Sequence, residues 1–169
     1  MAIVAGFAPG PYNRGVTIAV ELPDEAATRT LAARVAEVAE PGDVIALRGE
    51  LGAGKTVFAR AFIHASGAGD EVPSPSFTLV NLYHVPRATI WHFDLYRLES
   101  AEETWELGIE DAFADGISLI EWPERLGRLL PARRLEIAFL FTERPEARRA
   151  LLSGGSEWRV RLARIAGDA

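Results

Sequence analysis

The sequence contains no cysteine and a single lysine among its 169 residues. Without thiols the chain cannot form a disulfide or a thiolate metal site, so nothing points to an oxidising compartment. The other 17 of its 18 basic residues are arginines, and 24 acidic residues outnumber them to give a net charge of −6. Because positive charge dominates affinity for a phosphate backbone, we expect any role with nucleic acid to be indirect.

Long hydrophobic runs are also missing. No segment approaches the roughly 18 apolar residues of a membrane-spanning helix. The apolar opening MAIVAGF lacks a basic start and leads at once into APGPYNRG, so it does not resemble a signal peptide. We therefore expect a cytoplasmic protein with no membrane contact. The length suits one globular domain over residues 16–166, preceded by a flexible Gly- and Pro-rich tail over residues 1–15.

Hydrophobic periodicity predicts alternating strands and helices. A strand over 15–22 is followed by a helix that Pro41 and Gly42 end, and then by a strand over 43–49 and a helix from Lys55. Further strands are expected over 78–85, 88–94, 116–122, 134–141 and 157–165, with short helices over 100–113 and 123–130. Residues 145–155 fit either a helix or a hairpin. The fold class is α/β: a P-loop NTPase-like three-layer sandwich, with a mostly parallel central sheet and antiparallel strands added late in the chain.

The only lysine belongs to a phosphate-binding motif. Gly49, Gly54, Lys55 and Thr56 satisfy G-x-x-x-x-G-K-[ST] between the expected strand and helix. In such a loop the backbone N–H groups surround phosphate oxygens, the lysine reaches between phosphates and the hydroxyl binds Mg²⁺. The expected nucleotide-binding residues are Glu50, Leu51, Gly52, Ala53, Gly54, Lys55, Thr56 and Val57.

The absence of a second lysine narrows the kind of nucleotide protein. An Asn-Lys-x-Asp guanine-reading element cannot be present, which favours adenine nucleotides over guanine nucleotides. A P-loop small-molecule kinase remains an alternative, with Arg144, Arg148 and Arg149 as a possible phosphate lid. An adaptor that binds ATP without hydrolysing it is a second alternative.

Two acids are expected at the ends of buried strands, where the phosphates of a P-loop protein lie. Asp94 ends one such strand and Glu121 ends another. Glu121 is favoured as the Mg²⁺ ligand because its strand is the more uniformly apolar, and so the better neighbour for the phosphate-loop strand. Either acid could instead be an ordinary surface carboxylate that caps a helix.

Five segments, in order across residues 49–126, resemble the bacterial TsaE family: GELGAGKT, SPSFTL, HFDLYRL, LGIEDAF and LIEWPERL. The resemblance implies a Mg²⁺-dependent ATPase that takes part in the synthesis of threonylcarbamoyladenosine in tRNA. It also implies two protein partners, the threonylcarbamoyl transferase TsaD and its paralogue TsaB. The tRNA would be contacted only through that complex.

The resemblance assigns expected roles to single residues. Lys55 and Thr56 would bind phosphate and Mg²⁺, Glu121 would complete the metal site, and Asp94 would orient or activate water. Trp122 resembles the functional aromatic that follows the acid in the family.

The segment SPSFTL is the expected switch loop. Ser74, Ser76 and Thr78 could offer hydroxyls to a γ-phosphate, although a rigid loop that bonds its own backbone is an open alternative. Phe77 stands where the family has Tyr, so a bond made by that hydroxyl is absent here.

The remaining notable side chains are expected to be structural. His64, His84 and His92 show no metal-ligand spacing, and Trp91, Trp105 and Trp158 are read as core or partner-facing aromatics. No arginine finger can be assigned, which predicts slow turnover that depends on partners.

Overall fold

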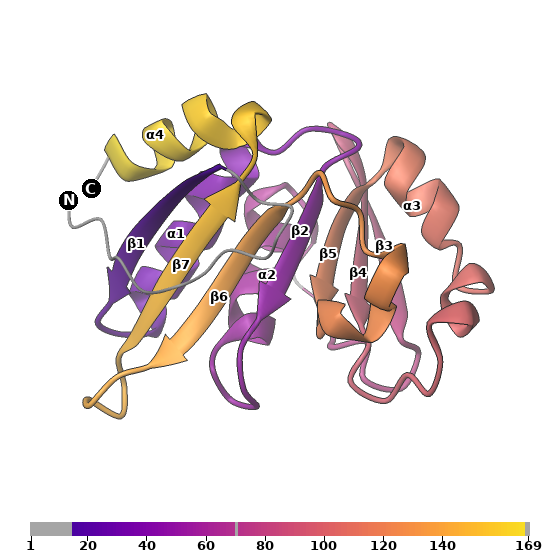
Figure 1. Ribbon diagram of the computed structural model, residues 1–169, viewed down its shortest axis with the longest axis horizontal. Coiled ribbons are helices and arrows are strands. Elements are labelled where there is room, and N and C mark those ends of the chain that lie inside the picture. Colours follow the sequence, from indigo (N-terminus) through magenta and orange to yellow (C-terminus); the bar gives the residue numbers. More distant parts are fainter. Residues whose placement is uncertain (1–14, 70, 168–169) are drawn as a thin grey trace.

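A computed structural model describes residues 15–69 and 71–167 (Figure 1). The tail expected over residues 1–15 therefore lies, except for Gly15, outside the described residues. The strands are β1 (Val16–Leu22), β2 (Val44–Arg48), β3 (Val80–Val85), β4 (Ala88–Asp94), β5 (Ile117–Glu121), β6 (Leu135–Phe141) and β7 (Arg148–Gly154). The helices are α1 (Glu25–Val38), α2 (Lys55–Ala65), α3 (Ile109–Asp115) and α4 (Arg159–Gly167), with 3₁₀ turns η1 (Ala101–Trp105), η2 (Pro123–Leu129) and η3 (Ser156–Trp158).

The strands form one mixed sheet in the order β1-β7-β6-β2-β5-β4-β3. Its centre, β6-β2-β5-β4, is parallel, whereas β3, β7 and β1 pair antiparallel. The α/β class and the parallel centre match the prediction. The antiparallel additions are not confined to the end of the chain, because β1 is the first strand and β3 lies near the middle.

Connection lengths explain two of the three antiparallel pairs, β3–β4 and β6–β7. Only Pro86 and Arg87 separate β3 from β4, and residues 142–147 separate β6 from β7. Connections this short cannot cross from one parallel strand to the next, so each pair forms a hairpin. The second hairpin also settles the ambiguity over 145–155 in favour of a hairpin, of which β7 is the second strand.

Two hydrophobic cores lie on opposite faces of the sheet. On one face the core contains residues of α1, α2 and α4, including Val35, Phe58 and Leu162. On the other face a smaller core joins α3 to β4 and β5 through Ile109, Phe93 and Ile120. Figure 1 shows α3 beside β4 and β5, while α4 lies across the end of β1 and β7. Helices therefore cover both faces only over part of the sheet.

The prediction of a strand over 157–165 is wrong. Residues 159–167 form α4, in which Leu162 and Ile165 are buried and Val160 is 71% exposed, and Trp158 of the preceding turn η3 is buried on the same side. The sequence alternates apolar residues at 158, 160 and 162, but it also carries the i, i+4, i+7 spacing of a helix. Because the residues with helical spacing are the buried ones, the segment forms a helix and not a strand.

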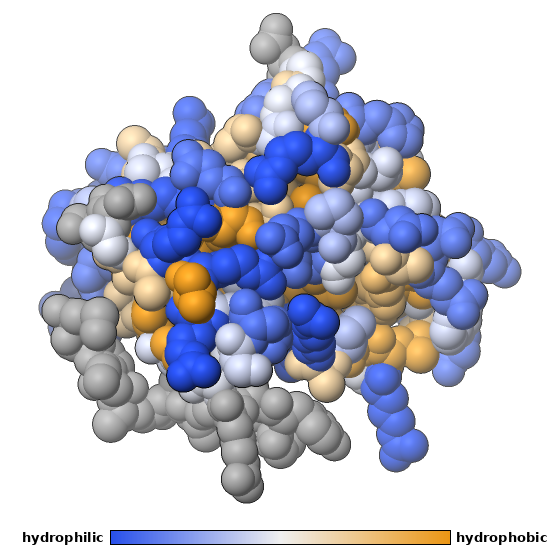
Figure 2. All heavy atoms as spheres, turned by 90° about the horizontal axis from the view of Figure 1, so that it is seen from above, coloured by the Kyte–Doolittle hydropathy of each residue, from blue (hydrophilic) through white to orange (hydrophobic). Residues whose placement is uncertain are grey.

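Figure 2 shows the end of the molecule that carries α4, where hydrophilic side chains predominate and hydrophobic ones occur in small groups. In the described parts of the chain, no helix has both the length and the apolar character needed to cross a membrane.

We expect Trp158→Ala to lower the free energy of unfolding by about 3–5 kcal/mol, because the indole is 1% exposed and its loss leaves a cavity under α4. Urea denaturation followed by far-UV circular dichroism measures this change. Trp105→Ala is the matched control, since that indole is 47% exposed and its loss should cost about 1 kcal/mol or less. Equal losses in the two variants would contradict the docking of α4.

Candidate functional site

The phosphate-loop motif forms the turn between β2 and α2. Gly49 has φ 142°, and a Cβ there would lie 2.8 Å from the carbonyl oxygen of Phe139. Gly54 caps α2 with φ 110°, a conformation that favours glycine. Gly49 thus allows a close backbone approach that a side chain would block, and Gly54 supplies a backbone conformation that other residues disfavour. The free N–H groups of the first turn of α2 face the loop.

Lys55 is only 4% exposed and is held inside the loop. Its Nζ donates to the carbonyl oxygens of Gly49, at 2.6 Å, and Glu50, at 2.8 Å, and lies 4.0 Å from the ring centre of Trp122. Burial lowers the pKa of Lys55, an effect that the carboxylate of Glu121 opposes. Trp122 keeps this position with φ 59°, a rare backbone conformation for a bulky residue.

Glu121 lies beside the start of α2 because β5 pairs in parallel with β2, with Leu47 opposite Glu121. Its carboxylate is 2% exposed. Thr56 Oγ1 donates to Oε2 at 2.8 Å, and His92 Nε2 lies 2.8 Å from Oε1. The prediction that the strand of Glu121 neighbours the phosphate-loop strand is confirmed.

Asp94 lies on the next parallel strand, in register with Glu121. It is 8% exposed and accepts a hydrogen bond from the Tyr96 backbone at 3.2 Å and a long one from Ser76 Oγ at 3.5 Å. Burial, followed by the nearby Glu121 carboxylate, raises the pKa of Asp94. The two expected acids are therefore neighbours in one site.

The expected switch loop is only partly directed at this site. Ser74 and Ser76 line the same cleft as Lys55, and their hydroxyls lie 2.8 Å apart. Thr78 is not among the lining residues and donates instead to Asn81 at 3.0 Å. Phe77 points outward, with its side chain 85% exposed.

Together these elements form a cleft of about 390 Å³. Its lining residues come from the phosphate loop, from the expected switch loop with Ser74 and Ser76 (the serine loop below), and from the ends of β4 and β5. They are Leu51, Gly52, Gly54, Lys55, Thr56, Val57, Ser74, Ser76, Asp94, Tyr96, Arg97, Glu121 and Trp122. Of the expected nucleotide-binding residues, Ala53 is fully buried and Glu50 is exposed, and neither lines the cleft.

Tyr96, Arg97 and His92 are site residues that sequence reasoning missed. Arg97 lines the cleft with its guanidinium 5.0 Å from the ring centre of Phe77. His92 is fully buried against Glu121. All three belong to HFDLYRL, and the period of two in β4 places His92 on the same side of the strand as Asp94. That spacing was the available signal.

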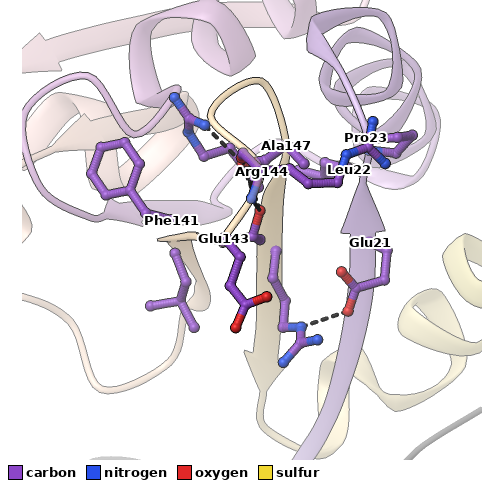
Figure 3. A pocket seen from close by; sticks show the side chains of 11 residues that line it. Glu21, Leu22, Pro23, Phe141, Glu143, Arg144 and Ala147 are labelled. Carbon is purple, nitrogen blue, oxygen red and sulfur yellow. Dashed lines mark hydrogen bonds and ion pairs between the residues drawn. The ribbon is translucent and has the colours of Figure 1, made fainter.

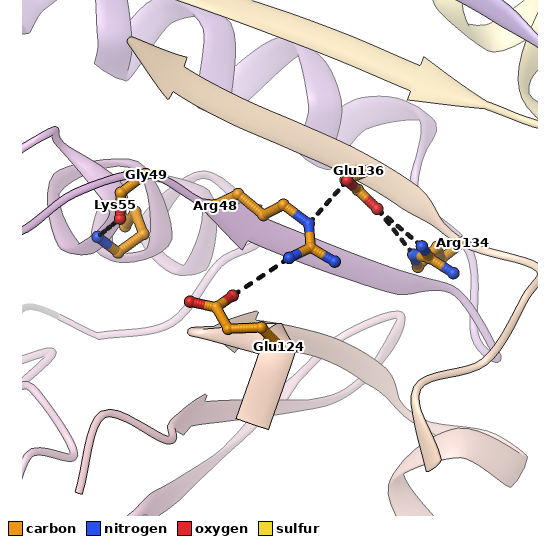
Figure 4. Close-up of polar contacts among 6 residues, drawn as sticks. All are labelled: Arg48, Gly49, Lys55, Glu124, Arg134 and Glu136. Carbon is orange, nitrogen blue, oxygen red and sulfur yellow. Dashed lines mark hydrogen bonds and ion pairs between the residues drawn. The ribbon is translucent and has the colours of Figure 1, made fainter. Parts of the chain in front are cut away.

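A network of ion pairs connects the base of the phosphate loop to the segment after Trp122 (Figure 4). Arg48 donates to Glu136 at 2.7 Å and to Glu124 at 3.3 Å, and Arg134 binds the other oxygen of Glu136 at 2.8 Å. Because Glu124 lies on η2, the network fixes η2 relative to the end of β2.

A larger hollow of about 880 Å³ lies between the β6–β7 hairpin and the end of β1 (Figure 3). Arg149 pairs there with Glu21, and Arg144 pairs with Glu146. Of the three arginines considered as a kinase lid, Arg148 contacts the phosphate loop, where it donates to the carbonyl of Gly52 at 3.3 Å. Since Lys55, Thr56 and Glu121 do not line this hollow, its size does not make it the better candidate site.

The fold and the site define an α/β protein with a mixed sheet and a phosphate-loop sequence at the carboxyl end of its central parallel strand. Residues 22–150 match the family model described as threonylcarbamoyl adenosine biosynthesis protein TsaE. The chain belongs to the TsaE family, which confirms the resemblance carried by the five motifs.

Related proteins support this assignment. The chain is 43% identical over 117 residues to the tRNA threonylcarbamoyladenosine biosynthesis protein TsaE of Rickettsia felis, covering 69% of this chain and 68% of that protein. It is 39% identical over 111 residues to the protein of the same name from Bacillus subtilis, covering 65% and 69% of the two chains. The crystal structure of YdiB from Bacillus subtilis aligns with a TM-score of 0.76 and 25% identity over 91% of this chain and 97% of YdiB.

Asp94→Asn should raise the melting temperature of the free protein near pH 7. Since the folded state raises the pKa of Asp94 above its ordinary value of 3.8, it binds this proton more tightly than the unfolded chain does. Stability is therefore lost as the pH rises above 3.8 through the folded-state pKa, and Asn avoids that loss.

Thermal melts of wild type and Asp94→Asn across this range measure the effect, which should shrink as the pH falls towards 3.8. The exposed Asp115→Asn is the control and should behave like wild type. A destabilised Asp94→Asn near neutral pH would contradict the assigned environment of this carboxyl group.

Proposed function

We propose that this protein binds MgATP and hydrolyses it as a component of tRNA threonylcarbamoyladenosine biosynthesis. The observation that carries the proposal is the convergence of Lys55, Thr56, Glu121 and Asp94 in one cleft at the carboxyl ends of β2, β5 and β4. The biosynthetic role comes from membership of the family and from the names of the relatives.

The phosphate groups would be held by the phosphate loop. The N–H groups at the start of α2 offer hydrogen bonds and a favourable dipole to an anion. The Lys55 ammonium, now bonded to two backbone carbonyls, would exchange these partners for phosphate oxygens. An ammonium on a flexible stem suits this exchange better than a planar guanidinium.

The oxygen donors beside the loop fit Mg²⁺. Thr56 Oγ1 and Glu121 Oε2 lie 2.8 Å apart, while the described residues contain no group of three or more His, Asp or Glu side chains that could form an all-protein metal site. Mg²⁺ typically binds one or two protein ligands together with nucleotide phosphates and waters. When bound, it would neutralise charge on the phosphates and stabilise the transition state.

Asp94 would orient the attacking water and accept its proton. The raised pKa of this carboxyl brings it closer to the range in which a general base works at neutral pH. The Ser76 hydroxyl beside it links Asp94 to the serine loop, so that a γ-phosphate contacting this loop would also affect the acid. The chemistry is thus mainly electrostatic positioning.

The nucleoside would extend from the phosphate loop towards α1. A furrow of about 300 Å³ adjoins the loop and is lined by Asp24, Glu25, Thr28, Gly52, Ala53, Gly54, Val57, Glu146 and Arg148. Its carboxylates could accept hydrogen bonds from the ribose hydroxyls and from an amino group of the base.

Turnover is proposed to depend on the TsaD and TsaB partners, with tRNA contacted through their complex. Apolar side chains in and beside the cleft are exposed: Leu51 by 73% and Tyr96 by 47% among its lining residues, and Phe77 by 85% against the lining residue Arg97. Exposed apolar clusters of this kind are typical of interaction surfaces. A partner seated there would close the cleft from water, which would strengthen its electrostatics.

Phosphate release from ATP, measured with and without TsaD and TsaB, tests the function. We expect slow release alone and faster release with both partners. Lys55→Ala should weaken binding of a fluorescent ATP analogue by about 10- to 1,000-fold, since one charge pair contributes up to about 4 kcal/mol at an effective dielectric near 20.

The exposed Arg128→Ala is the matched control for loss of one positive charge and should bind like wild type. Unchanged binding by Lys55→Ala would contradict the phosphate site. Transfer of the γ-phosphate to a small acceptor would favour a kinase, and tight binding of ATP without hydrolysis in the full complex would favour an adaptor.

Arg97 is proposed to place a positive charge near the γ-phosphate, the role for which sequence reasoning found no arginine. Arg97→Ala should lower the hydrolysis rate by at least about 100-fold while ADP affinity stays within about threefold, because ADP lacks the group that Arg97 would contact. Single-turnover hydrolysis and ADP titration measure the two effects. Loss of ADP binding to the same extent as hydrolysis would assign Arg97 to general phosphate binding instead.

A further inference from the structure

We propose that His92 is a positioning residue that fixes the carboxylate of Glu121 in the orientation required for the metal site. The inference rests on the proposed function for the identity of the metal. The positioning itself is a property of the metal-free protein. His92 would act through Glu121 without touching the nucleotide.

The two oxygens of Glu121 have separate partners. Oε1 lies 2.8 Å from His92 Nε2, and Oε2 accepts a hydrogen bond of 2.8 Å from Thr56 Oγ1. His92 therefore bonds to Oε1, the oxygen that does not face Thr56 at the start of α2. The oxygen beside the Thr56 hydroxyl stays directed at the cleft, where a cation could take it without disturbing the bond to His92.

Burial protects the hydrogen bond between His92 and Glu121 from competition by water. His92 is 0% exposed and Glu121 is 2% exposed, so solvent has little access to the bond between Nε2 and Oε1. A buried carboxylate without enough hydrogen-bond donors is costly, and donors to charged groups contribute more than donors to neutral ones. Without His92, Thr56 would be the only side chain with a hydrogen bond to Glu121 in the described structure.

The other ring nitrogen shows which tautomer fits the pocket. Nδ1 of His92 is buried and has no hydrogen-bond partner among the described residues. A proton on Nδ1 would create a buried donor with nothing to accept it, whereas an unprotonated Nδ1 leaves only an unused acceptor. The geometry thus favours the tautomer with its proton on Nε2, which donates directly to Glu121.

The backbone keeps the ring in place. His92 lies on β4 opposite Leu119 of β5, two residues before Glu121, and β4 pairs with β5 in parallel from Ile90 to Asp94. Both partners of the bond therefore sit on neighbouring, buried strands and have little freedom to separate. Supporting residues of this kind commonly change metal affinity by about 10- to 100-fold when they are replaced.

Two variants of His92 separate positioning from simple packing. His92→Phe keeps a planar ring but removes the donor. His92→Gln keeps an N–H donor near the position of Nε2. The control is His84→Phe, because His84 lies on the neighbouring strand β3 with an exposed side chain that contacts Thr89.

The first readout needs neither metal nor nucleotide. Amide resonances of Thr56 and Glu121 in two-dimensional ¹H–¹⁵N spectra of the free protein should shift in His92→Phe, and should stay near the wild-type positions in His92→Gln and His84→Phe. The second readout is Mg²⁺ titration of a bound fluorescent ATP analogue. His92→Phe should need about 10- to 100-fold more Mg²⁺, with largely restored affinity in His92→Gln.

The outcomes distinguish this inference from the proposed function. Unchanged Thr56 and Glu121 resonances in a folded His92→Phe variant would overturn the positioning role, as would equal Mg²⁺ affinity in His92→Phe and wild type. Equal losses of Mg²⁺ affinity in His92→Phe and His92→Gln would also overturn it, because the retained donor should rescue binding. Failure of wild type to bind MgATP would overturn the proposed function, while the resonance comparison would still decide the role of His92.

Discussion

The parallel register of β2, β5 and β4 is the constraint on which the site depends. Leu47 lies opposite Glu121, and Glu121 lies opposite Asp94, so three strand ends stop at one level. The phosphate loop leaves the first of these strands, and the two acids end the others. A shift of one residue in either pairing would turn an acid to the opposite face of the sheet. Because every residue of β5 is buried, such a shift would also require both hydrophobic cores to repack.

The free site already satisfies most of its own polar groups. Lys55 is bonded to loop carbonyls and lies over Trp122, while Glu121 is held by Thr56 and His92. Binding of a nucleotide must therefore exchange one set of contacts for another, and affinity reflects only the difference between them. These contacts preorganise the site, because they hold the side chains near their proposed working positions before a ligand binds.

Sequence reasoning named most of the residues that line the cleft because its signals were local and periodic. The glycine loop, Lys55 and the two acids at strand ends follow from short motifs and apolar runs, and the structure brings them together. Thr78 does not line the cleft, because its hydroxyl donates to a local partner, Asn81, three residues further along the chain, and nothing in the sequence favours that partner. The segment over 157–165 failed for a different reason: its apolar residues fit two periods, and only packing against the first core selects the helix.

The balance of charge in the cleft connects the metal to the nucleotide. Glu121 and Asp94 lie within one buried site, and Lys55 is the ammonium placed among them. A nucleotide alone would bring further negative charge towards two carboxylates, which would repel it. A divalent cation between Glu121 and the phosphates would convert that repulsion into attraction. In the proposed function, ATP and Mg²⁺ should therefore bind as a coupled pair, each raising the affinity for the other by the same factor.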